Sequence, residues 1–172
     1  AIIKIAHRLA TEDSPEIQQI LDNTVLLLVP SQNPDGQVMV IDHWYKTKGT
    51  QYSREYPDLY HKYTGHDDNR DWFMFTQIET RYAIEKVQNV YKPQLTHDMH
   101  QMGSCRARIF VMPATDPINI NVHPLIYRLN GIYGQAQGAA LEAAGKVGII
   151  YDDSYTNFWV GAMAWTGWWH NQ

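Results

Sequence analysis

The 172-residue sequence has little cysteine, no long apolar segment and no concentration of charge of one sign. Its single cysteine, Cys105, excludes a disulfide framework within the chain and a metal site built from several cysteines. The longest apolar run, residues 25–30, is far shorter than the roughly 20 residues of a membrane-spanning helix. The 14 Lys and Arg residues stand against 18 Asp and Glu residues, and neither sign forms a long run. We therefore expect no membrane span and no nucleic-acid partner.

What the sequence does contain is typical of a globular protein. Hydrophobic residues make up 44% of the chain and charged residues 19%, which excludes a mainly disordered polypeptide. The length is that of one ordinary domain. Eight histidines accompany the single cysteine, so a metal site would use histidine and carboxylate ligands.

Hydrophobic spacing predicts an α/β domain with a mainly buried sheet. The expected helices cover residues 2–9, 16–21, 75–91 and 125–145, and the expected strands cover residues 24–29, 94–99, 107–112 and 146–151. A tight turn at Asn33–Gly36 should follow the first strand, and residues 37–71 and 113–124 read as loops. In such sheets, functional residues gather where strands end. The segments after residues 29 and 99 are therefore the places to look for a site.

A polar turn, Gly65–Trp72, contains Asn69 and Arg70. The guanidinium of Arg70 presents a fixed fork of donors that suits a carboxylate or a phosphate. The alternative is a turn in which an aspartate side chain caps the backbone and Arg70 pairs with Asp67, Asp68 or Asp71. From these residues alone, the structural alternative is favoured.

A second polar cluster, His97–His100, lies at the end of a predicted strand. Strand alternation places Asp98 and His100 on one face and His97 on the other, so the two histidines do not converge on one ion. The spacing fits one ligand, His100, with Asp98 as a neighbouring carboxylate. From spacing alone, a hydrogen-bonded structural histidine is favoured over a metal ligand.

Taken in order, Asn33–Gly36, Gly65–Trp72 and Asp98–His100 resemble three motifs of the zinc metallocarboxypeptidases of the carboxypeptidase A-like family. The resemblance implies a three-layer domain with helices on both sides of a mixed sheet, and one Zn²⁺ ion. It implies that His100 is the third zinc ligand, and that Asn69 and Arg70 bind the terminal carboxylate of the substrate. The implied substrate is a peptide or acylated amino acid with a free carboxylate, hydrolysed at its C-terminal bond. An extracytoplasmic or secreted location follows from the same resemblance.

The sequence also departs from the family pattern. The family takes its first two zinc ligands from His-x-x-Glu, and no histidine here has glutamate three residues later. The family's general base is a late glutamate, and none follows Glu142. We therefore expect residues 1–172 to form a single, truncated catalytic domain, with two ligands before Ala1 and the general base beyond Gln172. Because one histidine cannot hold zinc alone, we expect this chain to be inactive.

Two other functions stay open. A related zinc amidohydrolase would use the same ligands on acylated amino acids or cell-wall peptides. A non-catalytic binding module would keep the carboxylate-binding pair and lack the metal. For the oxyanion-stabilising arginine of the family, Arg54 is a loose positional candidate and Arg108 another, although a surface role is favoured for Arg108. Cys105 has no convincing histidine partner for a nucleophile.

Overall fold

The computed structural model describes residues 2–53, 56–102, 107–153, 155–158 and 161–162. The chain divides into an N-terminal unit, residues 1–65, and a C-terminal unit, residues 66–172. The single domain expected over residues 1–172 stays a prediction. Among the helices that the structure describes, none has the length and apolar character needed to span a membrane.

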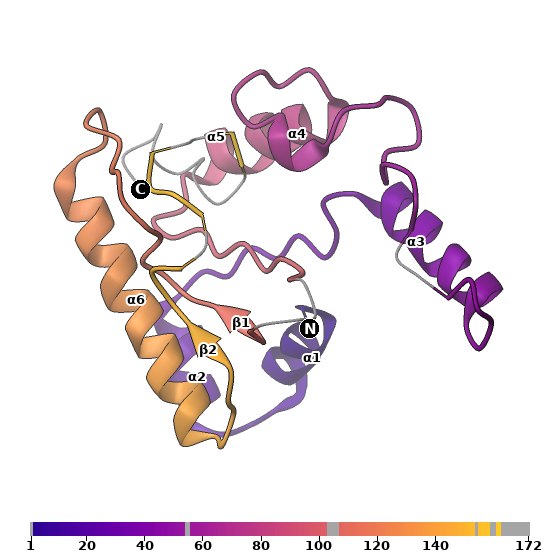
Figure 1. Ribbon diagram of the computed structural model, residues 1–172. Coiled ribbons are helices and arrows are strands. Elements are labelled where there is room, and N and C mark those ends of the chain that lie inside the picture. The colour runs from indigo at the N-terminus through magenta and orange to yellow at the C-terminus, as the bar shows by residue number, and fades with distance from the viewer. Residues whose placement is uncertain (1, 54–55, 103–106, 154, 159–160, 163–172) are drawn as a thin grey trace. The chain divides into compact units, whose positions relative to one another are not determined.

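The N-terminal unit contains three helices, α1 (Ile2–Thr11), α2 (Pro15–Asn23) and α3 (Pro34–Thr47) (Figure 1). The first two confirm the predicted short helices. Ser14 caps α2 by accepting a hydrogen bond from the N–H of Ile17 at 3.4 Å, and Pro15 occupies the first helical position. These local signals explain why α2 begins where the sequence predicts it.

The buried strand predicted over residues 24–29 is wrong. The segment forms no strand and pairs with none among the described residues, and Val25 is 86% exposed. Residues 26–29 are between 36% and 42% exposed. A run of β-branched and leucine side chains favours extended backbone, but a strand also requires a hydrogen-bonding neighbour, which the run does not encode.

Helix α3 occupies the first part of the predicted loop over residues 37–71, so that prediction is wrong as far as Thr47. Val38, Ile41 and Tyr45 recur three and four residues apart, which is helical spacing, so the signal was present in the sequence and was missed. These three residues and Trp44 are exposed, and in α3 only Gly36 is buried.

In the C-terminal unit, helical backbone runs from Ile78 to Tyr91 as α4 (Ile78–Tyr82), a π-helical segment η2 (Ala83–Gln88) and α5 (Asn89–Tyr91). This confirms the helix predicted over residues 75–91, although it begins three residues later. Lys92 adopts a left-handed conformation with φ of 46°, which ends the helix. The strand predicted over residues 94–99 is wrong, because that described segment belongs to no strand.

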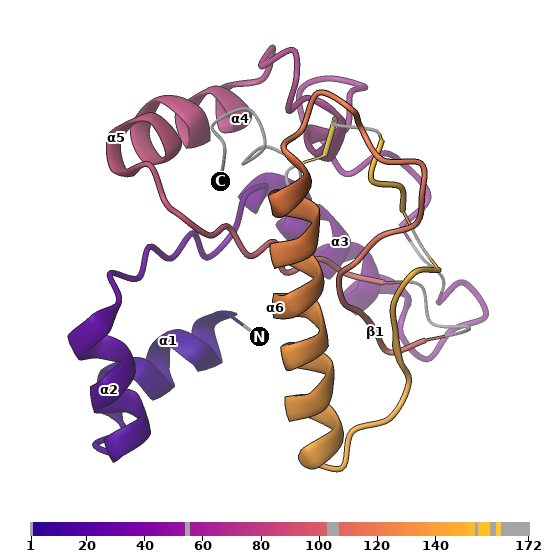
Figure 2. The same cartoon turned by 90° about the vertical axis from the view of Figure 1, so that its left-hand side faces the viewer.

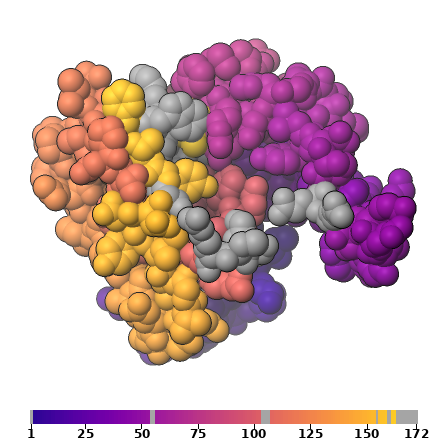
Figure 3. Space-filling model, in the orientation of Figure 1, coloured from indigo at the N-terminus to yellow at the C-terminus, as the bar shows by residue number. Residues whose placement is uncertain are grey.

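Two short parallel strands, β1 (Ile109–Phe110) and β2 (Ile149–Ile150), are joined through the long helix α6 (Pro124–Ala143). Ile109 pairs with Ile149, and Phe110 with Ile150. The strands predicted over residues 107–112 and 146–151 are therefore confirmed in part. Figures 1 and 2 show α6 running beside this sheet, and Figure 3 shows its side chains adjoining those that follow β2.

Glycines let α6 approach the sheet closely. A Cβ at Gly134 would lie 1.9 Å from the carbonyl oxygen of Met112, so only glycine fits there. A Cβ on Gly138 would meet Ile149 at 3.7 Å, an ordinary contact. The predicted helix over residues 125–145 is confirmed, and Gly145 with φ of 71° closes it with a hydrogen bond to the carbonyl of Glu142 at 2.9 Å.

The hydrophobic core of the C-terminal unit lies between α6 and the chain that follows each strand. Ala114, Ile126 and Ala162 are buried there, with Phe110 and Met112 packed against them. Helices with a parallel two-stranded sheet are compatible with the expected α/β class. The three-layer arrangement stays a prediction.

Candidate functional site

The turn that holds Asn69 and Arg70 is fixed by its own side chains. Asp67 accepts a hydrogen bond from the N–H of Asn69 at 2.8 Å, which begins a single 3₁₀ turn, η1 (Asp68–Arg70). Arg70 is exposed, and its Nη1 donates to the carbonyl of Asn69 at 2.8 Å. The capped turn considered from the sequence is therefore present. It coexists with an arginine fork at the surface.

Asp71 anchors this turn to the helix that follows. Its side chain is fully buried and accepts hydrogen bonds from the N–H and Oγ1 of Thr76, the N–H of Gln77 and the Oγ1 of Thr80. The Nε2 atom of His66 lies 3.3 Å from the same carboxylate. Burial raises the pKa of Asp71, but the hydrogen bonds from Thr76, Thr80 and the Gln77 N–H outweigh it and lower the pKa. The charged carboxylate thus holds the turn against the start of α4.

His100 contacts Asn69, 31 residues earlier in the chain. The Nδ2 atom of Asn69 lies 3.0 Å from the Nε2 atom of His100. The Nδ1 atom of His100 lies 2.9 Å from the carbonyl oxygen of Gln101. Because a carbonyl only accepts, Nδ1 carries the ring proton and Nε2 accepts from the amide. Two residues drawn from separate sequence motifs therefore lie in direct contact.

Asp98 lies beside His100 in the sequence and is partly buried. Burial raises the pKa of its carboxyl group, while electrostatic interactions with His100 and His97 act in the opposite direction. The net direction is upward.

The first motif has a structural role in the N-terminal unit. Asn33 caps α3 by accepting a hydrogen bond from the N–H of Gly36 at 2.8 Å, and its Nδ2 donates to the carbonyl of Tyr60 at 2.8 Å. Pro34 occupies the first turn of the helix. A Cβ at Gly36 would lie 2.1 Å from the Tyr60 carbonyl oxygen. Asparagine, proline and glycine in this motif are each explained by the start of the helix and the chain packed on it.

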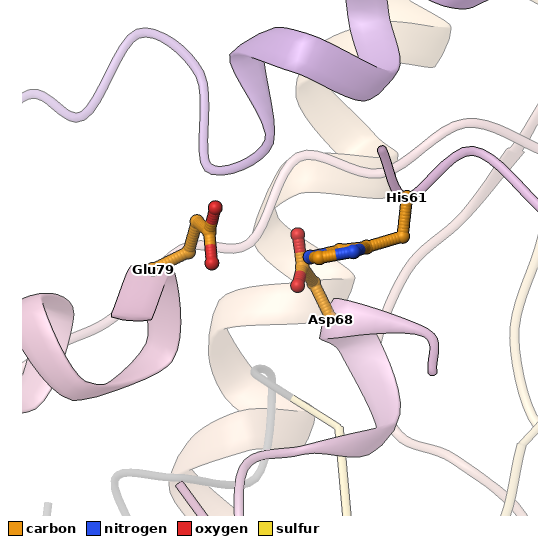
Figure 4. A group of neighbouring side chains, drawn as sticks. All are labelled: His61, Asp68 and Glu79. Atoms are coloured by element: carbon orange, nitrogen blue, oxygen red, sulfur yellow. The ribbon is translucent and has the colours of Figure 1, made fainter. Parts of the chain in front are cut away.

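A zinc site cannot be assembled around His100 from the described residues. Both ring nitrogens already make hydrogen bonds, and His100 belongs to no group of three metal-ligating side chains in the part of the chain that the structure describes. In the C-terminal unit, carboxylate oxygens of Asp68 and Glu79 lie within 4.8 Å of each other (Figure 4). His61, also labelled there, belongs to the N-terminal unit, where its Nδ1 accepts from the N–H of Thr64 at 3.1 Å. The residues around His100 therefore do not fit a metal as they stand.

The other residues considered from the sequence, Arg54, Arg108 and Cys105, add no functional group to this site among the described residues. Arg54 and Cys105 lie outside the described residues. Arg108 is exposed and packs beside Gly148, whose Cβ would lie 2.9 Å from its Cγ, so the surface role favoured from the sequence fits this placement. Sequence reasoning missed the anchoring role of Asp71. Its signal was an aspartate followed at short range by Thr76, Gln77 and Thr80 at a helix start.

Comparison with known proteins gives one finding. The family model for zinc carboxypeptidases matches residues 1–140, a range that contains all three motifs. Searches of curated proteins and of solved structures found no match.

Proposed function

Because the chain belongs to the zinc carboxypeptidase family, we propose that it carries the substrate-carboxylate and zinc-ligand residues of an enzyme that hydrolyses C-terminal peptide bonds. Asn69 and Arg70 bind the terminal carboxylate of a peptide or acylated amino acid, and His100 is one ligand of a single zinc ion. The observation that carries the proposal is the 3.0 Å contact between Asn69 and His100. It supports a common site for two residues that the family resemblance assigns to adjacent tasks.

The chemistry of the carboxylate pair follows from its donors. The guanidinium of Arg70 offers two parallel N–H groups, which match the two oxygens of a carboxylate, and the amide of Asn69 adds a neutral donor. Arg70 lies at the surface, where a substrate has direct access. Asp67 and Asp71 fix the turn, so little backbone ordering accompanies binding.

When bound, zinc in such enzymes polarises the scissile carbonyl and lowers the pKa of a water molecule. This chain supplies one of the three expected ligands and has no His-x-x-Glu sequence. We therefore propose that the 172-residue polypeptide is itself catalytically inactive. Metal analysis of the purified chain is expected to give well under one zinc per molecule, and a stoichiometric content would contradict this proposal.

The carboxylate-binding role is tested by measuring affinity for a blocked dipeptide with a free C-terminal carboxylate, and for the same dipeptide as an amide. We expect the free carboxylate to bind at least about 10-fold more tightly, because hydrogen bonds to a charged group contribute about 1.5–3 kcal/mol. Arg70→Ala should remove that preference. Arg81→Ala, at an exposed arginine on α4, is the matched control and should keep it. Equal binding of the two peptides by the unmodified chain would contradict the proposal.

A non-catalytic peptide-binding module is the second candidate, because both nitrogens of His100 are hydrogen-bonded. It predicts the same loss of affinity on Arg70→Ala and no effect of a metal chelator. A zinc amidohydrolase is distinguished at the level of activity. If the amidohydrolase function is correct, an enzyme that contains this chain together with the other zinc ligands would cleave substrates whose C-terminal carboxylate is blocked.

A further inference from the structure

Gln77, the residue directly before α4, holds both ends of the turn that carries Asn69 and Arg70. Its side-chain Nε2 donates a hydrogen bond to the carbonyl oxygen of His66 at 3.1 Å. Its backbone N–H donates to the carboxylate of Asp71 at 2.9 Å. Gln77 is 6% exposed, so water competes little for these two bonds. One buried residue therefore joins the chain before the turn and the chain after it to the start of the helix.

The hydrogen bonds inside the turn fix its shape but not its place. The N–H of Arg70 donates to the carbonyl of Asp67 at 2.9 Å, and the N–H of Asp71 donates to the carbonyl of Asp68 at 3.2 Å. Both bonds join residues three apart, so they would persist if the turn moved as a unit. The bonds from Gln77 join the turn to α4 instead. They set where the turn presents its side chains.

We propose that Gln77 is a positioning residue for carboxylate binding, because its side-chain amide holds the start of the turn and so fixes the place of the Arg70 guanidinium. This inference rests on the proposed function for the identity of the ligand. Two parallel N–H bonds to a carboxylate require one particular geometry, and a turn that shifts loses part of it. Gln77 acts through the turn and does not itself contact the peptide.

The side-chain donor of Gln77 can be removed while its bulk is kept. Methionine is unbranched and of similar length, so it fills the same space without an N–H group. The Oε1 atom of Gln77 is buried and has no hydrogen-bond partner among the described residues, so its removal breaks no further bond there. The backbone N–H still reaches Asp71 in Gln77→Met. We therefore expect this variant to fold and to hold the turn less firmly at His66.

The test is calorimetric titration of the 172-residue chain with a blocked dipeptide that has a free C-terminal carboxylate, and with its amide. Gln77→Met should lower the preference for the free carboxylate by about 2- to 10-fold, the factor that corresponds to one neutral hydrogen bond. Gln88→Met is the matched control, because Gln88 is also 6% exposed but donates to Thr96 at 3.4 Å and not to the turn. It should keep the preference of the unmodified chain. An equal loss of affinity for both peptides in Gln77→Met would indicate a structural role only and would overturn the proposal.

A second measurement uses the unmodified chain and so does not depend on the folding of a variant. By NMR, the side-chain amide protons of Gln77 should exchange with solvent more slowly than those of the exposed Gln94, and equal rates would overturn the proposal. Gln77→Asn, whose amide is too short to reach His66, replaces Gln77→Met if the latter does not fold. The two failures are distinguishable. No preference in the unmodified chain would refute the proposed function, whereas a full preference in the folded Gln77 variant would refute only the positioning role.

Discussion

Removal of the Asp71 carboxylate is the sharpest test of how the candidate site is held in place. The side chain is fully buried and accepts four hydrogen bonds, two from backbone N–H groups and two from hydroxyl groups. In Asp71→Ala, the hydroxyls of Thr76 and Thr80 can rotate to other acceptors, but the N–H groups of Thr76 and Gln77 cannot. The substitution therefore leaves two backbone donors without an acceptor, one in the buried residue Gln77 and one in the exposed residue Thr76.

The magnitude follows from that count. An unsatisfied buried donor costs about 1–3 kcal/mol, and water can satisfy the N–H of the exposed residue Thr76, so Asp71→Ala should lower the free energy of unfolding by about 1–3 kcal/mol. That is an appreciable part of the roughly 5–15 kcal/mol typical of a folded domain. In Asp71→Asn, one carbonyl oxygen replaces two carboxylate oxygens, so one of the two N–H groups keeps its acceptor. The expected loss is then about half as large.

Urea unfolding at pH 7, followed by tryptophan fluorescence, measures these differences, and the buried Trp72 lies next to the substitution. Asp153→Ala, at an exposed carboxylate of the same unit, should change the free energy of unfolding by less than about 0.5 kcal/mol. The reasoning is refuted if Asp71→Ala is as mild as this control. It is also refuted if the alanine and asparagine variants are equally stable.

The pH dependence has a definite sign. Burial raises the pKa of Asp71, but its hydrogen bonds prevail and bring the pKa below the ordinary value of about 3.9. A carboxyl group with a lower pKa in the folded state stabilises the fold above its unfolded pKa and loses that effect as the pH falls. The stability difference between the unmodified chain and Asp71→Asn should therefore shrink from pH 5 towards pH 3, and a difference that grew over this range would contradict the assignment.

Two glycines allow matched tests of packing. Gly36→Ala should destabilise the chain by about 1–3 kcal/mol, because the new Cβ would lie 2.1 Å from the carbonyl oxygen of Tyr60. Gly65→Ala is the control, because a Cβ there meets nothing within 4 Å. Thermal unfolding of both variants measures the difference. On α6, Gly134→Ala should cost about 1–3 kcal/mol through a clash with the backbone at 1.9 Å, whereas Gly131→Ala should be neutral or stabilise the helix by up to about 1 kcal/mol. Equal melting temperatures within either pair would show that the close approach is not present in solution.

How far the sequence predicts the fold depends on whether the signal is local. Helix α6 was predicted well, because its apolar spacing lies within the helix and its closing Gly145 lies two residues beyond Ala143, so both signals are local. The strands over residues 24–29 and 94–99 were predicted wrongly, because pairing depends on a distant neighbour that an apolar run does not specify. Helix α3 was missed although Val38, Ile41 and Tyr45 recur at helical spacing and Asn33-Pro34 gives a cap, because the Asn33–Gly36 motif was interpreted only as a turn.

The candidate site shows the same division. Asn69, Arg70 and His100 were identified through family motifs, and the contact between Asn69 and His100 agrees with their expected proximity. Their roles stay proposals. Spacing gave no indication that the Asn69 amide would contact the His100 ring, because the chain between them, residues 70–99, passes through a helix and an irregular segment. The buried network of Asp71 was also missed, since an aspartate beside a polar turn looks like a surface residue in the sequence.

The central proposal is that Asn69, Arg70 and His100 belong to one carboxylate-binding site. The most direct measurement adds a blocked dipeptide with a free C-terminal carboxylate to the ¹⁵N-labelled chain and follows the Asn69 side-chain amide and the His100 ring signals together. The account predicts that both sets of signals shift with one binding curve, and that the amidated dipeptide shifts neither. Shifts in only one of the two residues, or equal shifts with the amidated dipeptide, would contradict it.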